Sequence, residues 1–460
     1  MSTADRVAPA RRAAYEVLRR TFEGGAWADR ALPAAVERHR LDARDRALAQ
    51  RLAYGAIQRR GTLDHLIAVL ADRSAEEIDP PLLAALRLGL YELLFAAGTP
   101  DHAAVDQAVE LAKGADRGGR GARGRGTGLV NAVLRRAVRE RDALLAGLTT
   151  ETPAAAAVAL SHPRWLAEMW WAQLGADDAR SVMAADNDPA ETALRVNTLR
   201  ADPDRMVSEL AGAGMAVERP VAPPAPPESV VLSGPIGEPG ARRIDAGELV
   251  PQSRASAFVV ATLDPQPGER VLDLCAGPGI KTTQIAARMR DTGEIVAAEV
   301  DPGRARELRE LCGRLGASCV RVVEANAARD DLGEGYDRVL VDPPCSDLGT
   351  LASRPDARWR KSPRQIAGLA ELQAEILERA GAALRPRGTL VYSTCTISRR
   401  ENEDQVSAAL DGSDTGLGAE DLGRLHPELA SGHDHRFLQT RSDRDRTDGF
   451  FIARLWRESA

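Results

Sequence analysis

Two cysteines, 50 residues apart, each follow a predicted β-strand: Cys345 in the segment Asp342–Ser346 and Cys395 in the segment Tyr392–Thr396. Adjacent strands lie about 4.8 Å apart and parallel strands end at the same edge of a sheet, so the two thiols are expected side by side. Three interpretations stay open: inert buried thiols, a zinc site, and catalysis. The absence of a C-x-x-C motif and of a nearby histidine argues against zinc, and the position at strand ends favours catalysis.

A pair of thiols suits the methylation of C5 of cytosine, which is a poor nucleophile. Addition of a thiolate to C6 makes C5 electron-rich, so that C5 can attack a methyl sulfonium. A second thiol near C5 can remove the C5 proton or assist release of the enzyme. An acid at the N3 edge of the base stabilises the charge that builds during addition, and Asp342 is the candidate. The alternative for Asp342 is a cap after the strand.

A glycine-rich segment, Asp273–Thr282, follows the first strand of the C-terminal region. Glycines permit a tight turn and close approach of a ligand to the backbone. Glu299 lies 20 residues after Gly279, at the end of the next strand, where a carboxylate can accept hydrogen bonds from two ribose hydroxyls. Thr282 replaces the third glycine of a dinucleotide motif, and the P-loop spacing is absent. S-adenosylmethionine, which has no phosphates, is therefore favoured, and a ligand-free turn remains the alternative.

From about residue 250, apolar strand-like runs alternate with helical segments. This pattern predicts a doubly wound, mostly parallel sheet. The last strand follows a charged hairpin-like stretch and could run antiparallel to its neighbour. The predicted strands are Arg270–Ala276, Glu294–Val300, Cys319–Ala325, Tyr336–Asp342, Thr389–Thr394 and Phe450–Trp456.

The first 145 or so residues show helical spacing of apolar side chains. Asp79 before two prolines is a predicted helix cap, and further helices are expected at Ala103–Lys113 and Leu129–Arg141. The Gly- and Arg-rich segment 114–128 between them is predicted to be a flexible loop, either merely solvated or in contact with phosphates. Residues 148–247 combine helices with one short strand signal, which predicts a small α+β subdomain.

The composition is that of an ordinary globular protein, with 44% hydrophobic and 28% charged residues in 460. It excludes collagen-like, disulfide-scaffold and fully disordered classes. No apolar run reaches the roughly 18 residues of a membrane helix. An odd number of cysteines, five, favours a reducing cytoplasm. Residues 1–150 hold 24 Lys and Arg against 19 Asp and Glu, a net +5, while the remainder is −11, which hints at a basic binding module on an acidic body.

Together these motifs resemble the RNA cytosine-5 methyltransferases of the NOL1/NOP2/Sun superfamily, and within it the bacterial 16S rRNA cytosine-5 methyltransferase B family. The resemblance rests on Asp273–Thr282, Asp342–Ser346, Ser393–Thr396 and the Asp-Gly-Phe-Phe run that begins at Asp448. Residues 195–200 and 252–256 match segments before the fold. The N-terminal region, through 129–136, resembles the helical domain of the NusB antitermination factor.

The resemblance implies three parts. Residues 1–147 would be an all-α, NusB-like RNA-binding domain, and 148–247 a helical linker with a small α+β RNA-binding subdomain. Residues 248–460 would be a Rossmann-like S-adenosylmethionine-dependent methyltransferase domain with a seven-stranded, mostly parallel sheet. The implied partner is RNA, in this subfamily 16S rRNA, with no metal and no membrane, and a monomer is expected.

Roles follow from the resemblance position by position. Cys395 would add to cytosine C6, and Cys345 would serve proton removal and release. Asp342 and Lys281 would belong to both the catalytic and the cofactor-binding sets. The remaining cofactor-binding residues would be Cys275, Ala276, Gly277, Pro278, Gly279, Ile280, Glu299, Asp301 and Asn326.

The chain departs from the family motifs at several positions. Asn326 stands where the family commonly has Asp, so it can hydrogen-bond near the adenine but cannot ionise. Gly277 replaces Ala, Ile280 replaces Gly, and Asp347 replaces Gly. These three changes are expected to concern the fit of the cofactor and not the two thiols, and Ile280 removes the freedom of a positive φ.

RNA contacts are expected from cationic, amide and aromatic side chains near the substrate opening. For Trp359 the alternative is core packing. A tRNA cytosine-5 methyltransferase is the nearest competing function. An NAD-dependent oxidoreductase and a non-catalytic antitermination protein are competitors of other classes, and the paired cysteines argue against both. The expected RNA-binding residues are Arg195, Asn197, Arg200, Arg358 and Trp359.

Overall fold

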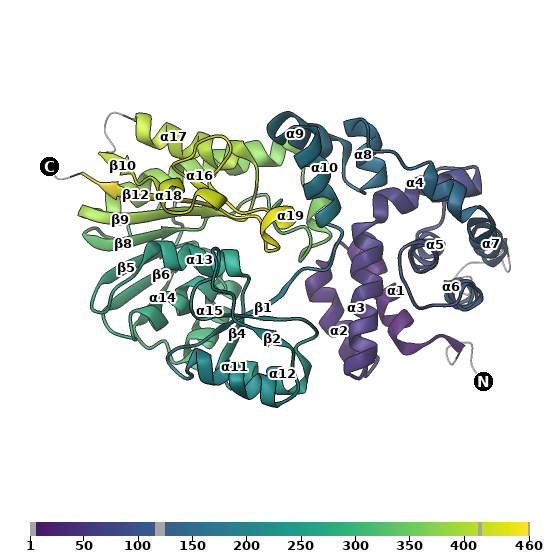
Figure 1. Cartoon of the computed structure of the whole chain (residues 1–460), viewed down its shortest axis with the longest axis horizontal. Coiled ribbons are helices and arrows are strands. Elements are labelled where there is room, and N and C mark those ends of the chain that lie inside the picture. Colours follow the sequence, from purple (N-terminus) through teal and green to yellow (C-terminus); the bar gives the residue numbers. More distant parts are fainter. Residues whose placement is uncertain (1–5, 116–124, 413–415, 459–460) are drawn as a thin grey trace. The chain divides into compact units, whose positions relative to one another are not determined.

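The computed structural model describes residues 6–115, 125–412 and 416–458, and the chain folds into two compact units (Figure 1). The first unit comprises the chain up to Pro189 together with Leu351–Arg360, and the second comprises Ala190–Thr350 and Lys361 onward. The helical segment after residue 147 therefore belongs with the N-terminal helices, although the sequence grouped it with the small subdomain. The expected arginine contacts of segment 114–128 lie largely outside the described residues.

The first unit is helical, and the apolar side chains between Val7 and Ala137 form one buried core. The helices predicted at Ala103–Lys113 and Leu129–Arg141 are present and are longer than expected. Asp79 does precede a helix, but its side chain makes no capping hydrogen bond, so the predicted cap is wrong in that detail. The helices are α1 Pro9–Phe22, α2 Ala28–Arg38, α3 Ala43–Gln58, α4 Arg60–Ala71, α5 Pro80–Leu94, α6 Asp101–Ala115, α7 Arg125–Ala146, α8 Pro153–Ala159, α9 Arg164–Leu174 and α10 Ala176–Ala185.

The segment Leu351–Arg360 is tied into this unit by buried polar contacts. The guanidinium of Arg358 is fully buried and donates to the carbonyl of Ser161 and the side chain of Asn187, at 3.0 and 2.9 Å. The indole Nε1 of Trp359 donates to the carbonyl of Ile57 at 2.8 Å. These bonds explain why ten residues from the C-terminal half of the chain belong to the helical unit.

The second unit begins with a small antiparallel sheet in the order β2-β3-β1-β4. Its apolar side chains pack together with those of α11 and α12. The predicted strand at 193–197 is the strand β1 of this sheet, so the α+β expectation is confirmed. The elements are β1 Thr192–Val196, α11 Pro203–Gly212, β2 Val217–Glu218, β3 Ser229–Leu232, α12 Gly237–Asp245 and β4 Leu249–Pro251.

The large sheet has the order β10-β12-β9-β8-β5-β6-β7. Strands β9, β8, β5, β6 and β7 are parallel, and β12 runs antiparallel to β9, as the sequence suggested. The short strand β11 pairs with β12 outside this order, which makes eight strands in the described part of the chain rather than the expected seven. The strands are β5 Arg270–Leu274, β6 Glu294–Glu299, β7 Val320–Glu324, β8 Tyr336–Val341, β9 Leu384–Thr394, β10 Leu417–Ala419, β11 Leu438–Gln439 and β12 Phe451–Arg457.

Apolar side chains on both faces of each central strand explain the doubly wound packing. In β5, Val271 belongs to one buried cluster with α13, α14 and α15, while Leu272 and Leu274 belong to another with α16 and α17. Helices consequently cover both faces of the sheet (Figure 1). The helices are α13 Arg254–Leu263, α14 Ile280–Arg288, α15 Pro302–Leu315, α16 Pro363–Ala383, α17 Glu403–Asp411, α18 Leu422–Leu425 and α19 Ser442–Asp445. Across residues 6–115, 125–412 and 416–458, no helix is both long and apolar enough to span a bilayer.

Candidate active site

The two predicted reactive cysteines lie together at the carboxyl ends of the adjacent parallel strands β8 and β9. Their sulfur atoms are 3.0 Å apart, and both thiols are free. Cys345 is buried, whereas Cys395 is partly exposed. The hydrogen bond with Cys345, followed by burial, raises the pKa of the Cys395 thiol well above its ordinary value. The resting nucleophile candidate is therefore a protonated thiol.

A carboxylate contacts the sulfur of Cys395, so the expectation that the change at Asp347 does not concern the thiols is wrong. The thiol donates to Oδ1 of Asp347 at 3.2 Å, and the other oxygen, Oδ2, accepts from Nζ of Lys361 at 3.2 Å. The same ammonium group donates to the carbonyl of Cys345 at 3.2 Å. The sulfurs of Cys345 and Cys395 and a carboxylate oxygen of Asp347 thus form one cluster, in which these atoms lie within 4.8 Å of one another.

A buried glutamate, which the sequence analysis did not single out, links the two cysteine segments. Oε1 of Glu401 accepts from the backbone amide of Ser346 at 2.8 Å, and Oε2 accepts from its hydroxyl at 2.5 Å. That hydroxyl also contacts the hydroxyl of Thr396 at 2.8 Å. Burial raises the pKa of Glu401. This network fixes the residues that directly follow both cysteines.

The Asp-Gly-Phe-Phe segment supports the same edge through its glycine. The amide of Gly449 donates to the carbonyl of Gly349 at 2.6 Å, and the amide of Gly349 donates to the carbonyl of Cys395 at 2.9 Å. A Cβ on Gly349 would lie 1.9 Å from the carbonyl oxygen of Gly449. Only glycine therefore permits this close approach of the two chains.

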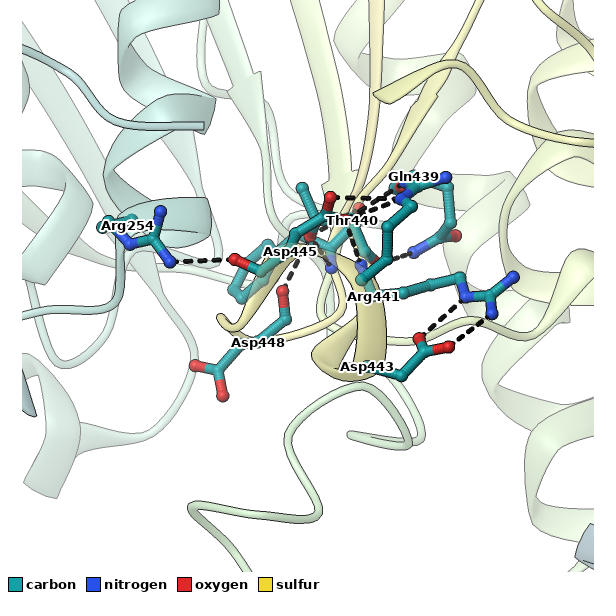
Figure 2. A network of polar contacts seen from close by, with 9 residues as sticks. Arg254, Gln439, Thr440, Arg441, Asp443, Asp445 and Asp448 are labelled. Atoms are coloured by element: carbon teal, nitrogen blue, oxygen red, sulfur yellow. Dashed lines mark hydrogen bonds and ion pairs between the residues drawn. The ribbon is translucent and has the colours of Figure 1, made fainter. Parts of the chain in front are cut away.

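A polar network holds the loop that precedes Gly449 (Figure 2). Arg254, at the start of α13, donates to the backbone carbonyl of Asp445 at 2.9 Å. The hydroxyl of Thr440 donates to the carbonyl of Asp448 at 2.7 Å. Arg441 forms a two-pronged ion pair with Asp443 at 3.0 and 2.6 Å. The charged stretch before β12 is therefore an ordered support of the cysteine edge.

The candidate acid Asp342 follows β8 directly and forms an ion pair with Lys281, Oδ2 to Nζ 2.7 Å. Burial alone would lower the pKa of Lys281, but the Asp342 carboxylate outweighs it and the net pKa is raised. The ammonium also lies 5.0 Å from the ring centre of Phe450. Lys281 is thus a mostly buried cation that is paired with Asp342.

The glycine loop runs between β5 and α14, beside the end of β6. The carboxylate of Glu299, 3% exposed, accepts from the amides of Gly277 and Asp301 at 3.1 and 2.9 Å. The side chain of Asp301 accepts from the amide of Arg304 and caps α15. Cys275 adopts a positive φ of 64°, and burial raises its pKa to about 12, so this thiol is inert at neutral pH.

The remaining loop residues take backbone roles. The amide of Ala276 donates to the carbonyl of Ala298, Pro278 follows Gly277, and Gly279 has a φ of 107° immediately before Ile280 begins α14. Asn326, two residues after β7, accepts from the amide of Ala328 at 3.0 Å and organises a local turn.

These residues fit a nucleoside with an attached amino acid. Gly277 has no side chain beside Glu299, and a Cβ there would lie 2.2 Å from Oε2. A nearly buried carboxylate beside this opening suits two ribose hydroxyls, and the Asp342 carboxylate suits an ammonium group. The glycine loop, Glu299 and Asp342 lie at the carboxyl ends of β5, β6 and β8, where ligands of such sheets bind.

Three of the five expected RNA-binding side chains are buried, which corrects the prediction. Arg195 donates to Oε1 of Gln252 at 2.7 Å and to the hydroxyl of Thr283 at 3.2 Å. Asn197 donates to the carbonyls of Gly247 and Leu315, both at 2.9 Å. Arg358 is committed to the internal bonds described above.

The other two expected RNA-binding residues differ from each other. Arg200 is exposed. Trp359 is partly buried against the helical core, with Arg60 over its ring at 5.3 Å, which matches the core-packing alternative. Of these five residues, Arg200 is the one whose side chain is exposed.

Comparisons with known proteins agree with this arrangement. Residues 260–456 match the family described as 16S rRNA methyltransferase RsmB/F, residues 8–139 the NusB family, and residues 162–237 the ferredoxin-like domain of RsmF/B-like methyltransferases. The chain is 31% identical over 401 residues to a Bacillus subtilis protein named "Probable ribosomal RNA small subunit methyltransferase B", with 86% of each chain covered.

A second relative, ribosomal RNA small subunit methyltransferase B of Klebsiella pneumoniae, is 31% identical over 86% of this chain and 88% of its own. The crystal structure of PH0851 superposes with a TM-score of 0.82 at 27% identity, covering 98% of this chain and 99% of that one. The expected fold and the expected NusB-like region are thereby confirmed. The chain belongs to the RsmB/F family of 16S rRNA methyltransferases.

Proposed function

We propose that this chain is an S-adenosylmethionine-dependent methyltransferase that modifies C5 of a cytosine in 16S rRNA. The observation that carries the proposal is the 3.0 Å approach of the Cys345 and Cys395 sulfurs at one sheet edge, in a member of this family. Two thiols that converge in this way can act in sequence on one pyrimidine ring.

Cys395 is the nucleophile in this proposal. It is the more exposed of the two thiols, so a flipped-out base can reach it, and addition to C6 makes C5 electron-rich. From the buried side of the pair, Cys345 accepts the C5 proton as a thiolate or assists elimination as a thiol. Asp342, paired with Lys281 at 2.7 Å, holds the polar edge of the base.

S-adenosylmethionine, when bound, supplies the methyl group. Glu299 binds the ribose hydroxyls, and the backbone of the glycine loop from Cys275 to Ile280 lines the pocket. Asp301 and Asn326 shape the two turns beside the nucleoside, and Arg200 contacts RNA phosphate. The three functional parts that we propose are 1–147, 148–247 and 248–460, with helices α8 to α10 of the second part folded into the first structural unit, in a monomeric enzyme of the cytoplasm.

The experiment is bisulfite sequencing of total RNA from cells that lack the protein, beside the parent strain and a strain complemented with the intact chain. Loss of one 5-methylcytosine in 16S rRNA, restored by complementation, is the expected result. Loss in a tRNA instead would favour the competing tRNA methyltransferase. Unchanged cytosine methylation in both RNAs would contradict the proposal.

A further inference from the structure

The proposed chemistry leaves one proton unassigned. Cys395 must lose its thiol proton as its sulfur adds to C6, and its raised pKa means that this proton is present in the resting enzyme. The groups that face the sulfur are Cys345, Asp342, Asp347 and the ammonium of Lys281. Two neighbouring carboxylates disfavour a free thiolate, so the proton has to leave during the attack rather than before it.

The direction of the hydrogen bonds selects the acceptor. Cys395 has a single S–H proton, and this proton is donated to Oδ1 of Asp347 at 3.2 Å. In the 3.0 Å contact between the sulfurs either thiol can be the donor, and a thiol sulfur is a weaker acceptor than a carboxylate oxygen. Asp342 is occupied by Lys281 at 2.7 Å, and the two lysines are cations that have no lone pair to accept a proton.

We propose that Asp347 is a catalytic residue that accepts the Cys395 proton during addition and returns it during release. The inference rests on the proposed cytosine-C5 function. As the Sγ–C6 bond forms, the S–H bond breaks, an O–H bond forms on Asp347, and the C5=C6 electron pair moves onto C5, in conjugation with C4 and N3. After methyl transfer, the C5 proton leaves to Cys345, its electron pair re-forms C5=C6, and the Sγ–C6 bond breaks. The sulfur then takes back its proton from Asp347, and the carboxylate is regenerated.

The surroundings of Asp347 suit this task. Lys361 donates to Oδ2, the oxygen that does not face Cys395, while Oδ1 accepts from the thiol. Proton transfer from the Cys395 thiol to Asp347 is unfavourable while it would leave a free thiolate. It becomes favourable when the sulfur bonds to C6, because a thioether sulfur is only weakly basic. The Cys395 thiol therefore loses its proton only when a pyrimidine is present and the Sγ–C6 bond forms.

The backbone at this position dictates which variants are informative. Asp347 has a φ of 59°, in the left-handed region that Asn, Asp and Gly tolerate. Asp347→Asn keeps the size and the turn but cannot take up a proton. Asp347→Gly removes the side chain without backbone strain. Asp264→Asn is the matched control, since Asp264 has a φ of 53°, is exposed, and hydrogen-bonds to Gln266 rather than to the cysteines.

The first measurement needs no RNA. In a Cys345→Ser background, alkylation of Cys395 by iodoacetamide is followed by peptide mass spectrometry between pH 6 and 11. In both Asp347 variants, removal of the charge is expected to lower the pH midpoint of Cys395 alkylation by about one unit. Below the midpoint this corresponds to about tenfold faster alkylation. The Asp264 variant should match the parent. An unchanged or raised midpoint would overturn the proposal.

The second measurement uses the full chain with Cys345 intact, 16S rRNA and S-adenosylmethionine. Asp347→Asn is expected to reduce kcat at least tenfold, while KM for RNA stays within twofold. An undiminished kcat overturns the role of Asp347 and leaves the proposed function standing. If the unaltered chain transfers no methyl group to RNA, the proposed function fails, and the proton-transfer role fails with it.

Discussion

The backbone of Gly449 lies directly against that of Gly349, with a 2.6 Å hydrogen bond between them, and this contact joins the loop before β12 to the turn after Cys345. Gly349 in turn donates to the carbonyl of Cys395. The relative positions of the two sulfurs therefore depend on a contact between two residues that have no side chains.

Gly349→Ala should destabilise the second unit and slow methyl transfer, because its Cβ would meet a backbone oxygen at 1.9 Å. Overpacking of this kind costs about 1–3 kcal/mol in the free energy of unfolding. Thermal unfolding followed by circular dichroism checks the prediction. Gly368→Ala is the control: Gly368 is exposed in α16, and a Cβ added there would meet no atom within 4 Å, so this change should stabilise by about 0.5–1 kcal/mol. Equal melting temperatures for both variants would contradict the steric argument.

Cys345→Ala should accumulate a covalent adduct with RNA, since addition through Cys395 can proceed but release is impaired. Cys395→Ala should form no adduct. Denaturing gel electrophoresis of the protein incubated with 16S rRNA and S-adenosylmethionine separates adduct from free protein. The opposite pattern would mean that the roles of the two thiols are reversed.

Glu299→Gln should raise KM for S-adenosylmethionine about tenfold or more with little change in KM for RNA. The loss of hydrogen bonds to a charged group, about 1.5–3 kcal/mol, sets this magnitude. Steady-state kinetics at varied cofactor concentration provide the measurement. Glu324→Gln is a matched control. Glu324, on β7, pairs in register with Glu299 on the neighbouring strand β6, but its side chain is exposed. A similar rise in KM in both variants would argue against a specific ribose contact.

Asp273 should make the protein less stable as the pH rises through weakly acidic values. Burial raises its pKa to about 7, so the native state binds the proton more tightly than the unfolded chain does. The stabilisation from this proton is fully present below about pH 4 and is lost progressively up to about pH 7. Between pH 4 and 8, the melting temperature of the parent should therefore fall by several degrees more than that of Asp273→Asn. Asp245→Asn, at an exposed site, should follow the parent, and a parallel decline in all three proteins would count against the assignment.

The sequence predicted the sheet and the cysteine pair well because both depend on local patterns. Alternation of apolar runs located the six strands that it singled out, and the position of Cys345 and Cys395 after adjacent strands sufficed to bring their sulfurs together. Parallel strand ends meet at one edge whatever the details of the loops.

What the sequence could not predict depends on partners distant along the chain. Arg195 and Arg358 look like surface cations by residue type, yet each is buried by acceptors that the fold places around it, such as Gln252 and Ser161. Glu401 was missed because its partner Ser346 lies 55 residues away. The sequence around an arginine does not show whether its side chain is buried in internal hydrogen bonds or is exposed to contact phosphate.

The inclusion of Leu351–Arg360 in the helical unit has a consequence for evolution and for protein engineering. The chain passes from one unit to the other three times, after Pro189, after Thr350 and after Arg360. A shortened protein that starts at residue 190 would retain Arg358 and Trp359 but lose Ser161, Asn187 and Ile57. The buried guanidinium would then lose most of its acceptors, and the indole would lose the carbonyl that accepts from it. The helical part is therefore no detachable accessory, and gene fusions or deletions that treat it as a removable module should yield misfolded protein.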